Sequence, residues 1–279
     1  CSLILQDSVS LPILHLFLCH QQGYHTKILD ATILFYNTKR VSLTNISEIF
    51  YAQSQLLLYN HNMERGNVFD ELRKEILDLT LKPGTELNLN QLSTIFGVSR
   101  SPVRDAVKEL AGEHLIDIYP QRGTYVSRIN LRMADDERFI RLNLELGSIP
   151  DFIENVNDDL VSEMEDLIEK QEKAFALRDT SLLLKLDDQF HSIIFRGAER
   201  EGVFDFILTR NGNYHRMRLI SFMFDAISED VIRQHKLILE TIKEKDTERL
   251  LSLDKAHMSK LKKEIVSFRE TMPQYFLDK

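Results

Sequence analysis

From about residue 66 onward, apolar residues recur at three- and four-residue intervals, a spacing that is typical of amphipathic helices. The first predicted helix runs from about Val68 to Thr80, and Pro83 and Gly84 follow it as helix breakers. A second, shorter helix is expected over Gln91–Phe96. The chain from this point therefore begins as a succession of short helices.

A turn and a third helix follow directly. Asn90 is expected to cap the helix before the turn, and Gly97 supplies the turn itself. Either Ser99 or Ser101 can cap the third helix, which we expect to end near Glu113. Helix, glycine turn and helix in this order predict a helix-turn-helix.

The third helix has one cationic face and one apolar face. Arg100, Arg104 and Lys108 are spaced four residues apart, so they share one side of the helix. The apolar positions fall on the other side: Val103, Val107 and Leu110. Such a row of cations is most often a solvated surface, but after a glycine turn it also suits a reader of the DNA major groove.

Two short strands come next, Leu115–Tyr119 and Thr124–Ser127, joined by a turn that contains Arg122 and Gly123. Three helices and a hairpin predict a winged helix-turn-helix. The basic helix and the basic hairpin tip together favour DNA binding over a merely solvated face.

Charge is distributed unevenly along the 279 residues, whose net charge is −8. Residues 63–130 carry nine Lys/Arg against ten Asp/Glu, whereas residues 131–279 carry 23 against 30. A nearly neutral DNA-binding domain cannot rely on non-specific attraction to phosphates, so a few placed cations must provide recognition. No apolar run reaches the length of about 18 residues that a membrane-spanning helix needs.

The segment before the first methionine, Met63, differs from the rest. Leu11–Cys19 has the length of a signal-peptide core, but it lacks a preceding basic region and a small-residue cleavage site. We therefore expect residues 1–62 to be a leader that is disordered or lies outside the natural protein. Cysteine occurs only at Cys1 and Cys19, which excludes a disulfide framework in the main body and suits a cytoplasmic location.

Residues 66–128 resemble the DNA-binding domain of the GntR family of bacterial transcription regulators. The resemblance implies that Arg100, Ser101, Arg104 and Lys108 face operator DNA from the recognition helix. It also implies that Arg122 and Gly123 enter the minor groove. Two positions depart from the family pattern, His114 where glycine is usual and Asn90 where an acidic residue is common. The residues that carry the resemblance are Leu81 to Gly84, Leu92, Gly97 to Arg100, Pro102 to Val107, Leu110, Leu115, Ile116, Arg122 and Gly123.

Residues 131–279 are expected to form a second domain, an antiparallel all-α bundle, so that the whole chain is mainly α. Few helix breakers interrupt this region, and short connections make consecutive helices neighbours. The predicted helices are Asp135–Asn155, Asp158–Leu177, Thr180–Gly197, Val203–Phe224, Glu229–Lys245 and Thr247–Thr271.

Four side chains in this domain have the pattern of a metal site. Asp187 and His191 lie one turn apart on one predicted helix. His235 and His257 lie eleven residues on either side of a predicted turn near Asp246, which places them at about the same height in an antiparallel hairpin. One carboxylate and three imidazoles suit Zn²⁺, Ni²⁺ or a similar divalent ion. Spacing alone leaves open that these are scattered surface or core residues.

The same region resembles the FCD ligand-binding domain of the FadR-type GntR subfamily. In that domain an Asp-x-x-x-His pair and two later histidines form a metal site, which matches Asp187, His191, His235 and His257. Asp188 is an alternative carboxylate ligand. His215 is a further candidate, although a packing role is more typical of such a histidine.

Arg141 and Glu145 match a family element on the first helix of the bundle. The resemblance implies that Arg141 can pair with an anionic effector. An intrahelical ion pair between Arg141 and Glu145 is an equally good interpretation.

These features together indicate a metabolite-responsive transcription regulator, in our expectation a repressor. It would bind double-stranded operator DNA as a homodimer and sense a small carboxylate effector at the metal ion. The alternative is a metal-dependent enzyme that acts on a small organic acid, because such an ion can activate water. A purely structural metal is a third possibility.

Overall fold

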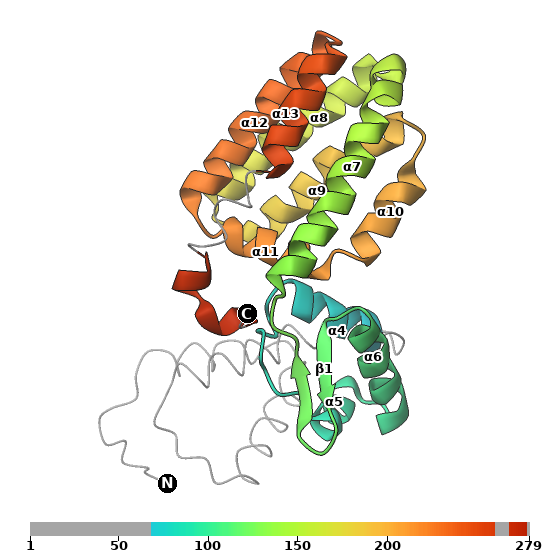
Figure 1. Ribbon diagram of the computed structural model, residues 1–279, viewed down its shortest axis with the longest axis vertical. Helices are drawn as coiled ribbons and strands as arrows, with labels where there is room; N and C mark the ends of the chain where they lie inside the picture. Colours follow the sequence, from blue (N-terminus) through green and yellow to red (C-terminus); the bar gives the residue numbers. More distant parts are fainter. Residues whose placement is uncertain (1–67, 260–267, 278–279) are drawn as a thin grey trace, which may run out of the picture. The chain divides into compact units, whose positions relative to one another are not determined.

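The computed structural model describes residues 68–259 and 268–277 (Figure 1). Every described residue belongs to one compact unit, Glu64–Lys279. The expectations for residues 1–62 and for part of the last predicted helix fall outside the described residues. Within the described part, no helix is both long and apolar enough to cross a membrane.

The first elements form the predicted winged helix-turn-helix. Helices α4 (Val68–Leu77), α5 (Leu89–Phe96) and α6 (Arg100–Gly112) precede strands β1 (Ile116–Tyr119) and β2 (Gly123–Val126). Helix α6 packs against α4, α5 and β1. The apolar side chains at their shared centre are buried: Leu72, Ile76, Val103, Val107, Leu110 and Leu115.

The cap of α5 differs from the prediction. Asn88, not Asn90, is the capping residue, because its side-chain oxygen accepts hydrogen bonds from the backbone nitrogens of Asn90 and Gln91. Both asparagines can cap a helix, and the register of the buried Leu92 selects the earlier one. Gly97 ends α5 with a φ of 64°, as predicted for the turn residue.

The wing is an antiparallel hairpin in which Ile116 pairs with Val126 and Tyr119 pairs with Gly123. Glycine is required at position 123 for two reasons. Its φ is +124°, and a Cβ there would lie 3.0 Å from the ring of Tyr125. His114, before β1, has a φ of 58°, a left-handed conformation that the glycine usual at this position of the family pattern would adopt more easily.

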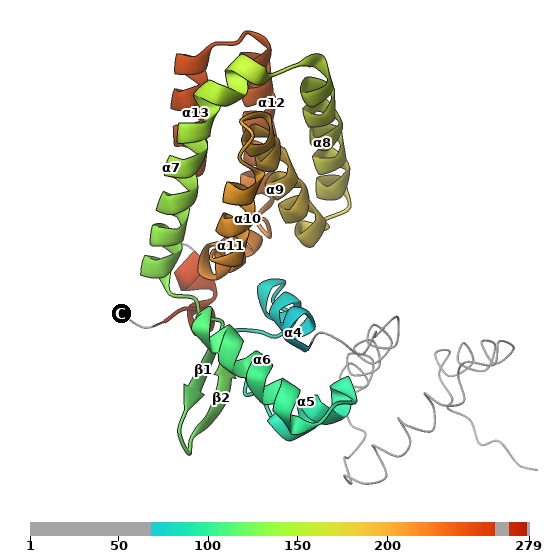
Figure 2. The same ribbon diagram turned by 90° about the vertical axis from the view of Figure 1, so that its right-hand side faces the viewer.

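The second part of the unit is an all-α bundle (Figure 2). Helices α7, α9, α8, α12 and α13 contact one another in that cyclic order, so they surround a common interior. Helix α11 packs mainly on α7, and α10 packs mainly on α9. The bounds are α7 Leu131–Asn155, α8 Asp158–Ala176, α9 Thr180–Gly197, α10 Glu201–Thr209, α11 Gly212–Ser221, α12 Asp225–Lys243 and α13 Thr247–Ser259.

Two predictions for the bundle were wrong. Consecutive helices are not always neighbours, because α9 rather than α8 packs beside α7. The segment expected as a single helix, Val203–Phe224, is divided into α10 and α11 by Arg210 and Asn211. Asn-Gly is a turn-forming dipeptide, and the continuous apolar spacing obscured it. Gly212 also lies against Leu115 of the wing domain, where a Cβ would come within 2.8 Å of Leu115 Cδ2.

Two glycines in the bundle provide a stability test. A Cβ on Gly197 would lie 2.5 Å from Cδ2 of the buried Phe152, whereas one on Gly147 would contact nothing within 4 Å. We expect Gly197→Ala to lower the free energy of unfolding by about 1–3 kcal/mol through overpacking. Gly147→Ala should raise it by about 0.5–1 kcal/mol, because alanine favours the helix. Urea unfolding measures both values, and shifts of the same sign would contradict the packing described.

Candidate DNA-binding surface and metal centre

The cationic face of α6 is exposed, as its spacing predicts. Arg100, Arg104 and Lys108 all lie on the solvent side, and Ser101 is exposed in the first turn. Within the described ranges, none of the three cations forms an ion pair with a protein carboxylate. They are therefore available to phosphates or base edges, and their role in DNA binding stays a prediction.

The tip of the wing presents one more cation. The guanidinium carbon of Arg122 lies 5.8 Å from the centre of the Tyr119 ring. The hydroxyl of Tyr125 donates to the backbone oxygen of Arg122 at 2.9 Å. The two aromatic residues thus support the turn while leaving the Arg122 side chain exposed.

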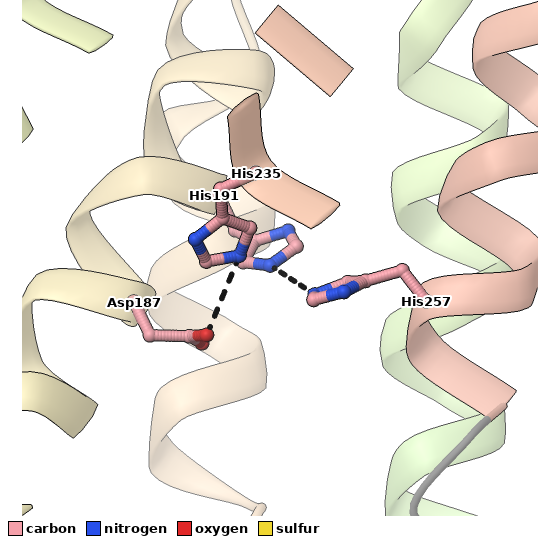
Figure 3. A group of neighbouring side chains, drawn as sticks. All are labelled: Asp187, His191, His235 and His257. Carbon is pink, nitrogen blue, oxygen red and sulfur yellow. Dashed lines mark hydrogen bonds and ion pairs between the residues drawn. The ribbon is translucent and has the colours of Figure 1, made fainter. Parts of the chain in front are cut away.

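Inside the bundle, the four predicted metal ligands converge (Figure 3). Asp187 and His191 come from α9, His235 from α12 and His257 from α13. One possible ligand atom from each lies within 4.8 Å of those from the other three. His191 Nε2 is 3.2 Å from His257 Nε2, and His235 Nε2 is 3.5 Å from Asp187 Oδ1. All but His257, which is partly exposed, are buried.

The Nδ1 atom of each imidazole ring contacts a side-chain oxygen atom on the side of the ring away from the converging Nε2 atoms. His191 Nδ1 contacts a carboxylate oxygen of Glu145, His235 Nδ1 lies 2.8 Å from Gln171 Oε1, and His257 Nδ1 lies 2.6 Å from Gln234 Oε1. The amide oxygens of Gln171 and Gln234 are acceptors, so they fix the tautomer in which Nε2 keeps its lone pair, and Glu145 does the same for His191 when it is ionised. This is the usual outer arrangement of metal-binding histidines.

The protonation states also suit metal binding. Burial lowers the pKa of His191 to about 4 and that of His257 to about 3, and it lowers the pKa of His235 strongly. All three imidazoles are therefore neutral near pH 7 and can donate a lone pair. Burial opposes ionisation of Asp187, but the surrounding positive groups, Arg218 foremost, together outweigh burial and lower the pKa of this carboxyl below its usual range.

The residues present fit a divalent ion. Nε2 of His235 is buried and has no hydrogen-bonding partner among the described residues, and such an orphan atom normally requires a ligand. One carboxylate and three neutral imidazoles form a donor set that suits Zn²⁺ or Ni²⁺. Ligation itself stays a prediction.

Asp188, the alternative carboxylate ligand, has other partners. Its Oδ1 accepts from Arg141 Nη1 at 2.8 Å and from Arg218 Nη1 at 2.7 Å. The second Arg218 nitrogen, Nη2, binds Asp187. One guanidinium thus bridges adjacent carboxylates of α9, and Asp187 rather than Asp188 belongs to the converging set.

Arg141 is buried beside this site; its predicted intrahelical ion pair with Glu145 is present, and its role toward an effector stays a prediction. Its Nε atom lies 3.8 Å from Glu145 Oε2, which is an ion pair but too long for a hydrogen bond. Burial raises the pKa of Glu145 to about 8.

His215 does not join the metal set. Burial lowers the pKa of its ring to about 4.

Helix α11 joins this centre to the wing. Arg218 binds the aspartates of α9, and two residues earlier Arg216 donates to Ser127 O at 2.7 Å, Gly212 O at 3.1 Å and Asn213 Oδ1 at 3.2 Å. The Asn213 amide oxygen in turn accepts from the backbone nitrogen of Asn130 at 3.0 Å, just before α7. A single ten-residue helix therefore contacts both the candidate metal centre and the exit of the hairpin.

Sequence reasoning missed several residues of the site. Arg218 was not recognised as a site residue because its helix, α11, was predicted as part of a longer helix. Gln171 could have been noticed as a polar residue on the otherwise apolar face of α8. Asp254 lies three residues before His257 and so shares its helix face.

Comparison with known proteins supports the assignment of the two domains. The sequence model described as "Bacterial regulatory proteins, gntR family" matches residues 64–126, and the FCD domain model matches residues 138–260. The chain is 27% identical over 209 residues to the HTH-type transcriptional repressor RspR of Escherichia coli, covering 75% of this chain and 92% of the relative. It is 26% identical to the gluconate operon transcriptional repressor of Bacillus subtilis, covering 68% and 79%.

A solved structure agrees on the fold. E. coli McbR/YncC matches with a TM-score of 0.58 at 24% identity, covering 73% of this chain and 96% of that one. The chain accordingly consists of a GntR-family helix-turn-helix domain followed by an FCD domain, and its relatives are GntR-type transcription regulators.

Proposed function

We propose that this protein is a metabolite-responsive repressor of the FadR-type GntR subfamily, with a DNA-binding domain at 63–130 and a sensor domain at 131–279. The observation that carries the proposal is the path through α11, which contacts both the candidate metal centre and the wing. Two relatives are named as repressors, which supports repression.

The operator would be read mainly by α6. We assign base-edge and phosphate contacts to Arg100, Ser101, Arg104 and Lys108, and minor-groove contacts to Arg122 and Gly123 at the wing tip. All six lie at the surface or at the wing turn. Because the domain has no net positive charge, these contacts must provide most of the affinity.

Arg104→Ala tests this assignment on a duplex operator selected from a random library with the wild-type protein. Loss of a base-edge contact should weaken binding by about 1–3 kcal/mol, roughly tenfold or more. Lys108→Ala should weaken binding to all duplexes similarly, as expected for a phosphate contact. Fluorescence anisotropy measures both, with Lys255→Ala on the bundle as a control. Undiminished selective binding by the Arg104 variant would refute its role.

We further propose that the protein acts as a homodimer whose two heads occupy operator half-sites related by two-fold symmetry. Apolar side chains are exposed together on α7 and α10: Phe139 is 60% exposed, Phe206 is 58% exposed, and Ile140 and Phe206 line one hollow. An apolar patch of this kind is typical of a protein interface. The anisotropy titration above also gives the stoichiometry, expected to be two chains per operator.

The effector would be a small carboxylate bound at a divalent ion, with Arg141 as its cationic partner. Asp187, His191, His235 and His257 would hold the ion, most suitably Zn²⁺ or Ni²⁺. When bound, the ion supplies open coordination positions for a carboxylate oxygen. The buried guanidinium of Arg141 can bind the same group.

Metal removal and replacement test the centre. Adding Zn²⁺ at about 100 times its Kd to chelator-treated protein should stabilise it by about 2.7 kcal/mol, or roughly 5–10 °C in Tm. His235→Ala should abolish this shift and the bound zinc, because it removes a central ligand. His215→Asn is the matched control and should keep both. Differential scanning fluorimetry and elemental analysis provide the measurements, and zinc retained by the His235 variant would contradict the site.

Occupancy of the centre would reach the DNA-binding domain through α11, because Arg218 and Arg216 lie on the same helix. A change in the partners of Asp187 alters the contact to Arg218. A shift of α11 then alters the contacts of Arg216 and Asn213 with the wing exit. Such coupling between sites is worth about 1–3 kcal/mol in typical cases.

Arg216→Lys separates coupling from binding. Lysine keeps the charge but cannot reach the three acceptors of the guanidinium together. We expect zinc stoichiometry to be retained, whereas the ratio of operator Kd values with and without zinc should move several-fold toward one. Arg196→Lys, exposed on α9, is the control. An unchanged ratio in the Arg216 variant would exclude this path.

The alternative expectation of a metal-dependent enzyme has no comparable support. The relatives are named as transcription regulators, and the DNA-binding domain accounts for the rest of the described chain.

A further inference from the structure

Beside the candidate metal centre, several buried polar atoms have no hydrogen-bonding partner among the described residues. They are Nε and Nη2 of Arg141, Oε2 of Glu145 and both carboxylate oxygens of Asp254. All three residues are fully buried. Unpaired polar groups in a protein interior are costly, so a concentration of them indicates a binding partner.

These atoms lie close together. Arg141 Nε is 3.8 Å from Glu145 Oε2, and possible ligand atoms of Glu145, Asp254 and His191 lie within 4.8 Å of one another. Because His191 also belongs to the candidate metal centre, the unpaired atoms adjoin the position at which an effector carboxylate would bind.

The donors and acceptors are divided between the three residues. Arg141 Nη1 is already bound to Asp188, which leaves the Nε and Nη2 edge, the pair of donors that binds a carboxylate in bidentate fashion. The Glu145 and Asp254 oxygens are acceptors if ionised, so they require a group that donates hydrogen bonds. The occupant must therefore carry both an acceptor and a donor.

The number of unpaired acceptors selects the kind of donor. The unpaired oxygens are Oε2 of Glu145 and both carboxylate oxygens of Asp254, three in all. An ammonium group offers three N–H donors and a positive charge, whereas the hydroxyl of a hydroxy acid offers one donor and no charge, and a simple acid offers neither. A zwitterion therefore satisfies these oxygens best, and its ammonium charge offsets the charge of the carboxylates once they are ionised.

We infer that the effector is a small amino acid, with its carboxylate at the metal and the Nε and Nη2 edge of Arg141 and its ammonium group donating to Glu145 and Asp254. This inference rests on the proposed sensing of a carboxylate at the metal centre. Asp254 is then a specificity-determining residue. It is the better position to substitute, because Glu145 also holds the ring of His191.

The test uses the zinc-loaded full chain and acids that differ only in the substituent beside one carboxylate: propanoate, lactate and alanine, then succinate, malate and aspartate, then glutarate, 2-hydroxyglutarate and glutamate. Isothermal titration calorimetry gives each Kd. In at least one series the ammonium member should bind about tenfold tighter or more than the other two, since a site built for a donor rejects analogues that lack it.

Asp254→Asn, which keeps the shape but removes the charge, should reduce that preference about tenfold without changing zinc stoichiometry. Glu248→Gln, exposed on the same helix, should leave both unchanged. Acids that bind with no gain from the ammonium group, or a hydroxy acid that binds best, would overturn the inference and leave carboxylate sensing intact. If none of the acids binds while zinc does, sensing of small acids fails as well. The wild-type comparison decides the matter even if the Asp254 variant does not fold.

Discussion

The bundle depends on holding the buried Asp187 and the partly buried Asp188 against the guanidinium of Arg218. Removing a charge from water is expensive, and the cost is recovered only when the opposite charge is close and well oriented. Arg218 binds both Asp187 and Asp188, and Arg141 adds a second cation to Asp188. This requirement fixes α11 against α9 and α7. It also favours the ionised form of Asp187, so the one carboxylate of the candidate ligand set is ready to bind a divalent ion.

The three imidazoles are prepared in a similar way. Each has its Nδ1 atom held by an oxygen from a different helix, α7, α8 or α12, so the rings are oriented by the packing of the whole bundle. A site preorganised in this manner spends little binding energy on ordering its ligands. An ion bound there would be connected to every helix of the ring, either through a ligand or through a residue that holds a ligand. Such an arrangement suits a sensor whose output is a small helix displacement.

Much of this could be predicted from the sequence because it depends on local spacing. One turn of helix relates Asp187 to His191, and equal distances from a turn relate His235 to His257. Other features depend on tertiary contacts that spacing does not encode. The cap at Asn88 was set by the register of Leu92, and the break before α11 was set by Asn211 and the close approach of Gly212 to Leu115. Because this break was not predicted, Arg218 was not recognised as the cation that pairs with the two aspartates of the site.

The hydrogen bonds between the DNA-binding domain and the bundle have a consequence for how related regulators can diverge in sequence. Arg216 donates a hydrogen bond to the main-chain oxygen of Ser127, and Arg73 of α4 donates one to the main-chain oxygen of Leu208 at 3.0 Å. Because both acceptors are backbone groups, the side chains at positions 127 and 208 can change without erasing these bonds. Under the proposed function, substitutions on α6 could change the DNA sequence that is bound, and substitutions around the candidate metal centre could change the effector, while these contacts between the two domains are retained.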